Sequence, residues 1–204
     1  MKEFWNERYS ENGFAYGIKA NDFLIENYHI FNPRSRILCL AEGEGRNAIF
    51  MAKHGFDVCA VDQSEIGINK LNKWATEENI KIESVVADLN EYGLGENKWD
   101  GIISIFGHLP PILRAKVHHE IIKSLKVGGL FLCEGYTIEQ LKFGTGGPKD
   151  SQLFLSKEIL QEELKELKLI KLEAKERIIS EGKYHQGNSA VVQFIGQKVG
   201  DSVQ

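Results

Sequence analysis

Residues 37–62 constrain the fold of this chain more than any other segment. An apolar run at 37–40 leads into a glycine turn at 41–45. A helix-like stretch then stops at Gly55, and a second apolar run ends in Asp62. Glycines at a strand-to-helix turn let a ligand approach the backbone, and a carboxylate about 20 residues later can bind ribose hydroxyls. This order predicts a nucleoside-binding half-domain.

The glycine turn alone is a weak signal. Gly43, Gly45 and Ala48 fit the loose dinucleotide pattern G-x-G-x-x-A, which also occurs where a turn merely packs a helix onto a strand. The strand before the turn, the helix after it and the acid that ends the second strand favour a binding site over that simpler explanation.

Composition narrows the class of protein. The chain has 204 residues, enough for one α/β domain with a full core. Its net charge of −4 provides no basic field for nucleic acid or for an anionic membrane. No apolar run approaches membrane-spanning length, and the first residues contain no apolar signal core. Cys39, Cys59 and Cys133 lie in apolar segments without C-x-x-C spacing, which favours buried free thiols, no metal site and a cytoplasmic location.

Strand-like and helix-like segments alternate through the first two thirds of the chain. We expect strands at 37–40, 56–61, 82–87, 101–106 and 129–134, with helices at 47–54, 64–78 and 111–125. Two short helices, at 5–9 and 21–30, precede the first strand. Such alternation predicts a mostly parallel sheet with helices on both faces.

The pattern changes after residue 134. Residues 136–150 are expected to form a long loop, and Ser156 is expected to cap a helix that runs through residue 167. Two further strands are expected at 169–179 and 190–195, joined by a link of hairpin length at 181–187. Strands joined in this way are antiparallel. Residues 199–204 are expected to be a disordered tail.

Five landmarks occur in a fixed order along the chain. They are the glycine turn with its preceding strand at 37–45, Asp62, Asp88 in Val-Val-Ala-Asp-Leu, the strand entry at 98–104, and the run 125–129 with its double glycine. With these landmarks the chain resembles a class I S-adenosylmethionine-dependent methyltransferase. It is similar to the small bacterial group of tellurite-resistance-type and thiopurine-type enzymes.

The chain departs from that family's pattern at a few positions. Cys39 stands where the family usually has an acid, Ala41 replaces the first glycine of the turn, and Val127 replaces a proline. Glu42 is an additional acid beside the turn, and it could partly replace the acid missing at Cys39.

The resemblance implies a single domain over residues 1–198, with residues 1–34 forming a helical lid. It also implies a seven-stranded sheet in the order 3-2-1-4-5-7-6, in which only the last strand is antiparallel. S-adenosyl-L-methionine is the implied cofactor: Asp62 would accept from the ribose hydroxyls and Asp88 from the adenine amino group. The expected cofactor-binding residues are Ala41, Glu42, Gly43, Gly45, Asn47, Asp62, Gln63, Ser64, Asp88, Leu89, Ser104 and Phe106.

The substrate is expected at the same edge of the sheet, because ligands of open parallel sheets lie at the carboxyl ends of the strands. Residues expected to contact it are Trp5, Arg8, Tyr9, Tyr16, Arg46, Tyr136 and Tyr184. His108 and His185 are the candidate catalytic bases, although either could simply satisfy a loop carbonyl. The neighbours His118 and His119 face different ways on a helix and are not expected to bind a metal ion.

The predicted activity is in-line methyl transfer to a small molecule. Positioning is its main requirement, and a base is needed only when the acceptor starts protonated. We expect no metal ion, no nucleic-acid or membrane partner, and a monomer or weak homodimer.

Two alternative functions remain open. One is an inactive S-adenosylmethionine-binding regulator, suggested by Cys39 and Ala41. The other is a nicotinamide-dependent oxidoreductase, which the glycine turn with Asp62 alone would permit. The motifs do not identify the methyl acceptor.

Overall fold

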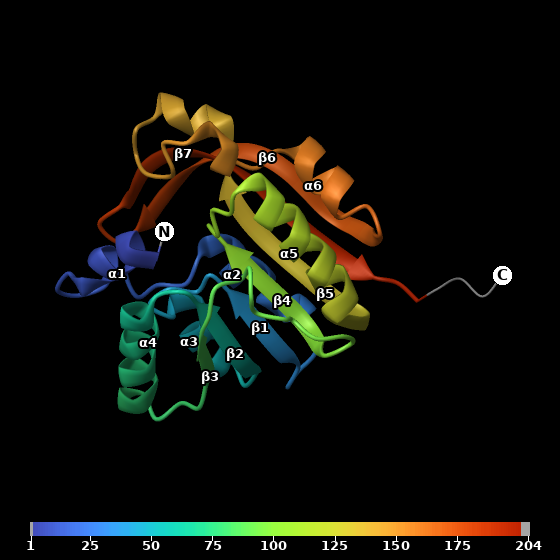
Figure 1. The fold of residues 1–204 in the computed structure, drawn as a ribbon, viewed down its shortest axis with the longest axis horizontal. Coiled ribbons are helices and arrows are strands. Elements are labelled where there is room, and N and C mark those ends of the chain that lie inside the picture. Colours follow the sequence, from blue (N-terminus) through green and yellow to red (C-terminus); the bar gives the residue numbers. More distant parts are fainter. Residues whose placement is uncertain (1, 201–204) are drawn as a thin grey trace.

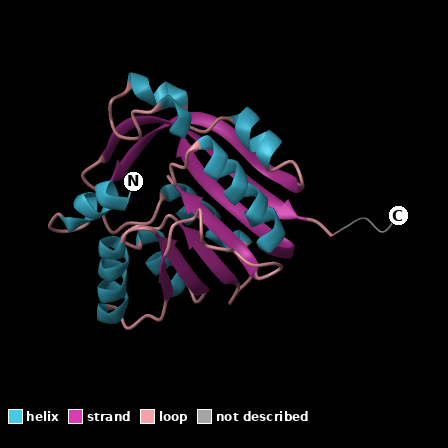
Figure 2. Ribbon diagram, in the orientation of Figure 1, coloured by secondary structure: helices cyan, strands magenta, loops and turns pink. Residues whose placement is uncertain are grey.

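The computed structural model describes residues 2–200, which form one seven-stranded sheet with flanking helices (Figures 1 and 2). The strands are β1 (Arg36–Leu40), β2 (Asp57–Asp62), β3 (Glu83–Val86), β4 (Trp99–Ile105), β5 (Leu125–Tyr136), β6 (Leu167–Glu181) and β7 (His185–Lys198). The α-helices are α1 (Lys2–Ser10), α2 (Asp22–Asn27), α3 (Arg46–Lys53), α4 (Glu65–Glu77), α5 (Pro111–Ser124) and α6 (Lys157–Glu163). Short 3-10 helices are η1 (Tyr28–Ile30), η2 (Ile138–Lys142) and η3 (Ser151–Leu153). The tail predicted to be disordered lies, from residue 201 onward, outside the described residues.

The predicted sheet topology is confirmed. The strand order is β3-β2-β1-β4-β5-β7-β6, and β1 to β5 pair in parallel. Strand β7 runs antiparallel to both β5 and β6. A link of only three residues, 182–184, joins β6 to β7, and so short a connection requires a reversal of direction.

Alternate residues of each central strand enter two separate cores. In β1, Ile37 and Cys39 pack with side chains of α2, α3 and α4, whereas Leu38 and Leu40 pack with α5 and α6. Figure 1 shows α5 and α6 in front of the sheet and α2 and α3 behind it. Successive side chains of a strand point to opposite faces of the sheet, and both faces are covered here. Each of these strands therefore appears in the sequence as a continuous apolar run. All three cysteines are buried in these strands as free thiols, as expected.

Several element boundaries differ from those predicted. Strand β5 runs from Leu125 to Tyr136, so Tyr136 belongs to the sheet, and the expected loop after it contains the 3-10 helix η2. Helix α6 stops at Glu163, because Leu167 already begins β6. The last two strands are longer than predicted and reach almost to the hairpin turn. The side chain of His185 therefore lies at the start of a strand rather than in a loop.

The N-terminal segment lies against the carboxyl edge of the sheet. Ser64, which caps α4, donates to the Asn6 side chain at 2.7 Å, and the backbone N–H of Ala15 donates to Glu44 Oε2 at 2.7 Å. On the other side, the N–H of Lys183 donates to the Ala15 carbonyl at 2.9 Å. This segment is thus attached to both halves of the sheet. Among the described residues, none of the helices is long and apolar enough to cross a membrane.

Candidate functional site

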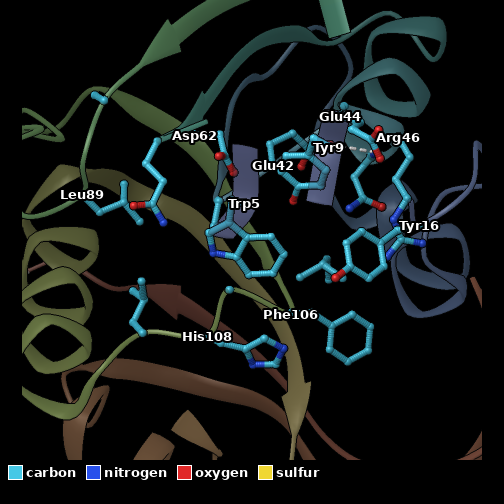
Figure 3. Close-up of a pocket in the computed structure, with 18 of the residues that line it drawn as sticks. Trp5, Tyr9, Tyr16, Glu42, Glu44, Arg46, Asp62, Leu89, Phe106 and His108 are labelled. Atoms are coloured by element: carbon cyan, nitrogen blue, oxygen red, sulfur yellow. Dashed lines mark hydrogen bonds between the residues drawn. The ribbon is translucent and has the colours of Figure 1, made fainter. Parts of the chain in front are cut away.

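A pocket opens at the carboxyl ends of the parallel strands, beneath the N-terminal segment (Figure 3). Its lining comes from α1, from the turn after β1 and from the ends of β2, β3 and β4. Fifteen of the residues predicted for the site line it: Trp5, Tyr9, Tyr16, Ala41, Glu42, Gly45, Arg46, Asn47, Asp62, Gln63, Asp88, Leu89, Phe106, His108 and His185. The topology therefore brings most of the predicted residues to one place.

The glycine turn adopts a left-handed backbone. The φ angles are 51° at Ala41, 61° at Gly43 and 93° at Gly45. A side chain at Gly45 would meet Leu71 Cγ at 2.5 Å, and one at Gly43 would overlap the Tyr9 hydroxyl. Only glycine avoids both the strain and the overlap, which explains the residue type at these two positions. Ala41 accepts a left-handed conformation without being glycine, as does Phe106, with a φ of 53°, on another side of the pocket.

Asp62 ends β2 with its carboxylate buried in the pocket wall. Oδ2 accepts from the Gly43 N–H at 2.8 Å and Oδ1 from the Ser64 N–H at 2.7 Å. Burial raises the pKa of this carboxyl, and the two backbone N–H groups oppose that rise. Each oxygen keeps a lone pair, so the carboxylate can still accept from two hydroxyls of a ligand. Asp88, after β3, is exposed at the rim beside the buried Leu89.

Glu42 places a second buried carboxylate in the pocket. Its Oε1 accepts from the N–H groups of Asn47 at 2.9 Å and Ala48 at 2.8 Å, and so caps the first turn of α3. Burial raises the pKa of Glu42 to about 7, against the lowering effect of those N–H groups and of Arg46. Cys39, which stands in the position of the family's usual acid, is fully buried in β1. Glu42 thus supplies an acid close to the turn from a different position.

Arg46 lies in the pocket wall as half of a buried ion pair. Its NH2 atom is 2.6 Å from Glu181 Oε2, and NH1 donates to the Lys19 carbonyl at 3.2 Å. Glu181 Oε1 also accepts from Asn21 Nδ2 at 2.9 Å. Burial alone would raise the pKa of Glu181, but His185 and Arg46 lower it to about 2. The carboxylate is therefore charged throughout the neutral range, and Arg46 is neutralised by it.

Aromatic rings line the opposite side of the pocket. Figure 3 shows Trp5, Tyr9 and Tyr16 facing Phe106 and His108 across a common space. Trp5 stacks on Tyr9, with ring centroids 5.6 Å apart, and Tyr16 lies 4.5 Å from the His185 ring. These rings come from the N-terminal segment, from the end of β4 and from the start of β7, which lie far apart in the sequence.

The two candidate bases have different surroundings. Burial, with a smaller effect of His185, lowers the pKa of His108 to about 3. Burial also lowers the pKa of His185, but Glu181 opposes this shift because its Oε2 lies 3.8 Å from His185 Nδ1. That Nδ1 is a buried nitrogen without a hydrogen-bond partner. Both imidazoles are neutral at neutral pH, and His185 has the carboxylate that can stabilise its protonated form.

Six predicted residues lie outside the pocket lining: Arg8, Gly43, Ser64, Ser104, Tyr136 and Tyr184. Gly43 and Ser64 support Asp62 through their N–H groups, and Tyr136 stacks behind Phe106 at 4.5 Å. Ser104 faces a smaller neighbouring cavity. Tyr184 lies under the Arg8 guanidinium, 3.7 Å from its ring centroid. Tyr184 is among the residues expected to contact the substrate, and the structure places its hydroxyl against Glu11.

Other lining residues were not predicted from the sequence: Gly17, Glu44, Ala87, Ile105, Gly107, Leu109 and Leu113. Glu44 is the most informative of them. It binds Lys70 at 2.8 Å and the Ala15 N–H at 2.7 Å, so it connects the turn to the N-terminal segment. Only its position within the glycine turn could have indicated from the sequence that Glu44 lines the pocket.

Residues 37–129 match a family described as a methyltransferase domain. The probable S-adenosyl-L-methionine-dependent methyltransferase TehB of Haemophilus influenzae is 33% identical over 110 residues, covering 52% of this chain and 37% of TehB. A second TehB sequence, from another Haemophilus influenzae strain, is 35% identical over 81 residues, covering 40% of this chain and 28% of its own length. The chain therefore spans less than half the length of the curated relatives it matches.

Solved structures share the fold. The crystal structure of Haemophilus influenzae TehB superposes with a TM-score of 0.73 at 20% identity, covering 97% of this chain and 66% of that one. A methyltransferase from Methanosarcina mazei, described as S-adenosylmethionine-dependent, gives a TM-score of 0.72 at 14% identity, covering 89% and 99% of the two chains. At such identities the likeness shows the fold.

Proposed function

We propose that this chain is a class I S-adenosylmethionine-dependent methyltransferase, which transfers the methyl group of S-adenosyl-L-methionine to a small molecule held beneath its N-terminal segment. One observation carries the proposal. The glycine turn, Asp62 and Asp88 line the same pocket as the aromatic rings of the N-terminal segment. This shared lining supports a nucleoside site that continues into an acceptor site.

The donor set of the pocket fits this cofactor. Asp62 offers lone pairs for the two ribose hydroxyls, and Leu89 offers an apolar face for the base. The left-handed turn at Gly43 and Gly45 lets the backbone come close to a ligand. Asp62 and Asp88, and Glu42 where it is ionised, add negative charge, which favours a ligand that carries a sulfonium and an ammonium. The remaining predicted contacts, through Asn47, Gln63 and Phe106, stay part of this proposal.

The cofactor supplies a methyl group that is already activated as part of a sulfonium. The protein's task is therefore to position the acceptor in line and to exclude water. Trp5, Tyr9 and Tyr16 act as a lid in this proposal, since Tyr9 packs on the glycine turn itself. The lid restricts the size of the acceptor, and the net charge of −4 gives no attraction for nucleic acid. Both features favour a small molecule.

Two measurements test the proposal. Calorimetry should show binding of S-adenosylmethionine and S-adenosylhomocysteine and no comparable binding of a nicotinamide dinucleotide. Release of S-adenosylhomocysteine should then be scored against a panel of thiols, oxyanions, amines, phenols and carboxylates. Binding without turnover of any acceptor would favour the inactive regulator, and failure to bind S-adenosylmethionine would reject the proposed activity.

A further inference from the structure

Several aromatic and imidazole rings line the part of the pocket next to the glycine turn. Tyr16 and His185 lie 4.5 Å apart, Phe106 and His185 meet edge to face at 4.9 Å, and Tyr9 lies 6.4 Å from Tyr16. Figure 3 shows Trp5 and Tyr16 on one side of this space and Phe106 and His108 on the other. Walls of this kind bind flat apolar groups by stacking and edge-to-face contact.

The charges around this space leave no cation for an anionic acceptor. Arg46 is the one lysine or arginine among the described residues that line the pocket, and Glu181 neutralises it at 2.6 Å. The nearby Arg8 stacks on Tyr184 and donates to the Tyr16 hydroxyl at 3.3 Å. The lining also carries the carboxylates of Asp62 and Asp88, together with Glu42, whose pKa is about 7, and Glu44, which pairs with Lys70 at 2.8 Å. An oxyanion would be repelled by these acids and would find no free positive partner.

His185 faces this space with a carboxylate behind it. Its Nδ1 is buried without a hydrogen-bond partner and lies 3.8 Å from Glu181 Oε2. Hydrogen bonds of catalytic groups are often long before a ligand binds and shorten in the complex. A proton held on Nδ1 towards Glu181 leaves Nε2 with the lone pair that can take a proton. The Arg46 guanidinium and the Asn21 amide both donate to Glu181 and already fix this carboxylate in place.

We infer that the methyl acceptor is an uncharged, planar aromatic molecule with an O–H or N–H group, and that His185 takes the proton of that group. This inference rests on the proposed function. In the step, the acceptor oxygen or nitrogen forms a bond to the methyl carbon while the carbon–sulfur bond breaks. The bonding pair goes to sulfur and gives neutral S-adenosylhomocysteine, and the acceptor proton goes to His185 Nε2 and then to solvent. A thiolate or metalloid oxyanion needs no such base and would bring its charge to the acidic wall.

Binding to the protein loaded with S-adenosylhomocysteine tests the charge preference without requiring turnover. Para-cresol and para-hydroxybenzoate share one ring and one hydroxyl, and differ by a methyl group in place of a carboxylate. Ligand-observed NMR should show para-cresol binding about tenfold or more tightly than para-hydroxybenzoate. Aniline should bind, and tellurite should not compete with para-cresol.

Variants separate the ring contacts from the proton transfer. Tyr16→Ala should weaken para-cresol binding about tenfold, whereas Tyr16→Phe keeps the ring and should retain most of the binding. Tyr28→Ala is the matched control, because Tyr28 packs on Phe50 away from the pocket. For an acceptor that is turned over, His185→Gln should lower kcat about 10²–10⁴-fold and leave KM within about threefold.

The outcomes are distinct. Equal or tighter binding of the carboxylate or of tellurite, no ring binding at all, or an unchanged kcat in His185→Gln would each overturn the inference while the proposed methyl transfer stands. Absence of S-adenosylmethionine binding would instead reject the proposed function itself. Preferential binding of the uncharged ring, lost in Tyr16→Ala and kept in Tyr28→Ala, supports the assigned acceptor class.

Discussion

The two sides of the pocket are built in different ways. The side proposed for the cofactor, called the cofactor side below, is formed by local backbone: a left-handed glycine turn, a helix start and an acid at the end of the neighbouring strand, all within residues 41–62. The side proposed for the acceptor, called the acceptor side, gathers single rings from residues 5–16, from the end of β4 and from the start of β7. One side is encoded by a contiguous motif, and the other exists only after the whole sheet has formed.

This difference has an energetic counterpart. On the cofactor side, buried carboxylates are satisfied by backbone N–H groups, as in Glu42 with Ala48 and Asp62 with Gly43. On the acceptor side, the buried carboxylate of Glu181 is satisfied by the side chains of Arg46 and Asn21 instead. These three residues come from distant segments of the chain. We therefore expect changes at the buried polar groups of either side to act on folding as well as on binding. Changes at the rings of the acceptor side should act on binding or rate with little loss of stability.

The largest expected effect is at Gly45, where backbone and packing coincide. Replacement by alanine forces a side chain into a φ of 93° and brings its Cβ to 2.5 Å from Leu71 Cγ. Backbone strain and overpacking together should cost about 3–5 kcal/mol of unfolding free energy, measured by urea denaturation. Gly55→Ala is the matched control: its φ is 83°, but a Cβ there meets nothing within 4 Å. Equal losses in both variants would mean that contact with α4 adds nothing.

The next effect concerns the proton on Glu42. Its pKa is about 7 in the folded protein and would be near the ordinary value of 4.5 in the unfolded chain. The folded state thus holds the proton more tightly, and Glu42 makes its full contribution to stability below pH ~4.5 and loses it as pH rises through ~7. That contribution is on the order of 3 kcal/mol. Glu42→Gln keeps an oxygen for the α3 N–H groups and should flatten this pH dependence in urea denaturation curves.

A surface acid provides the control for that measurement. Glu77, exposed on α4, is 4.0 Å from Lys73, and Glu77→Gln should leave the pH dependence of the wild type unchanged. Parallel pH curves for the wild type and Glu42→Gln would contradict the assignment and would place the buried proton elsewhere.

The contrast between the two sides also explains what the sequence could reveal. The strand order could be predicted through the family resemblance. The positions of Gly45 and Asp62 were predictable from the residues themselves, because apolar runs and turn residues follow from local rules. His185 was assigned to a hairpin link, because nothing in the residues around it shows that β7 starts there. The pairing of Arg46 with Glu181 joins α3 to the end of β6, a contact that depends on the final strand order. Glu44 was not predicted as a pocket residue, because both of its partners, Ala15 and Lys70, are distant in sequence.

Asp62 should contribute to binding as well as to the glycine turn, whose Gly43 N–H donates to it, and this tests the comparison within the cofactor side. Asp62→Ala removes the acceptor proposed for the ribose hydroxyls and should weaken S-adenosylhomocysteine binding by about 1.5–3 kcal/mol, or roughly 10–150-fold. Calorimetry measures the change directly. Asp57→Ala, at the exposed start of the same strand, should bind normally. Unchanged affinity in Asp62→Ala would remove this residue from the cofactor site.

The smallest expected effect is on the acceptor side, where the β6–β7 turn holds the N-terminal segment. Tyr184→Ala removes the ring beneath Arg8, at 3.7 Å, and the hydroxyl bound to Glu11. Because a stacked guanidinium near the surface contributes little, S-adenosylhomocysteine should dissociate only about two- to fivefold faster. Stopped-flow displacement measures that rate, and hydrogen exchange in α1 should accelerate with it. Ile178→Ala, exposed on β6, is the control and should change neither. A faster dissociation without faster exchange in α1 would show that the turn acts on the pocket through His185, the next residue, and not through the segment that covers it.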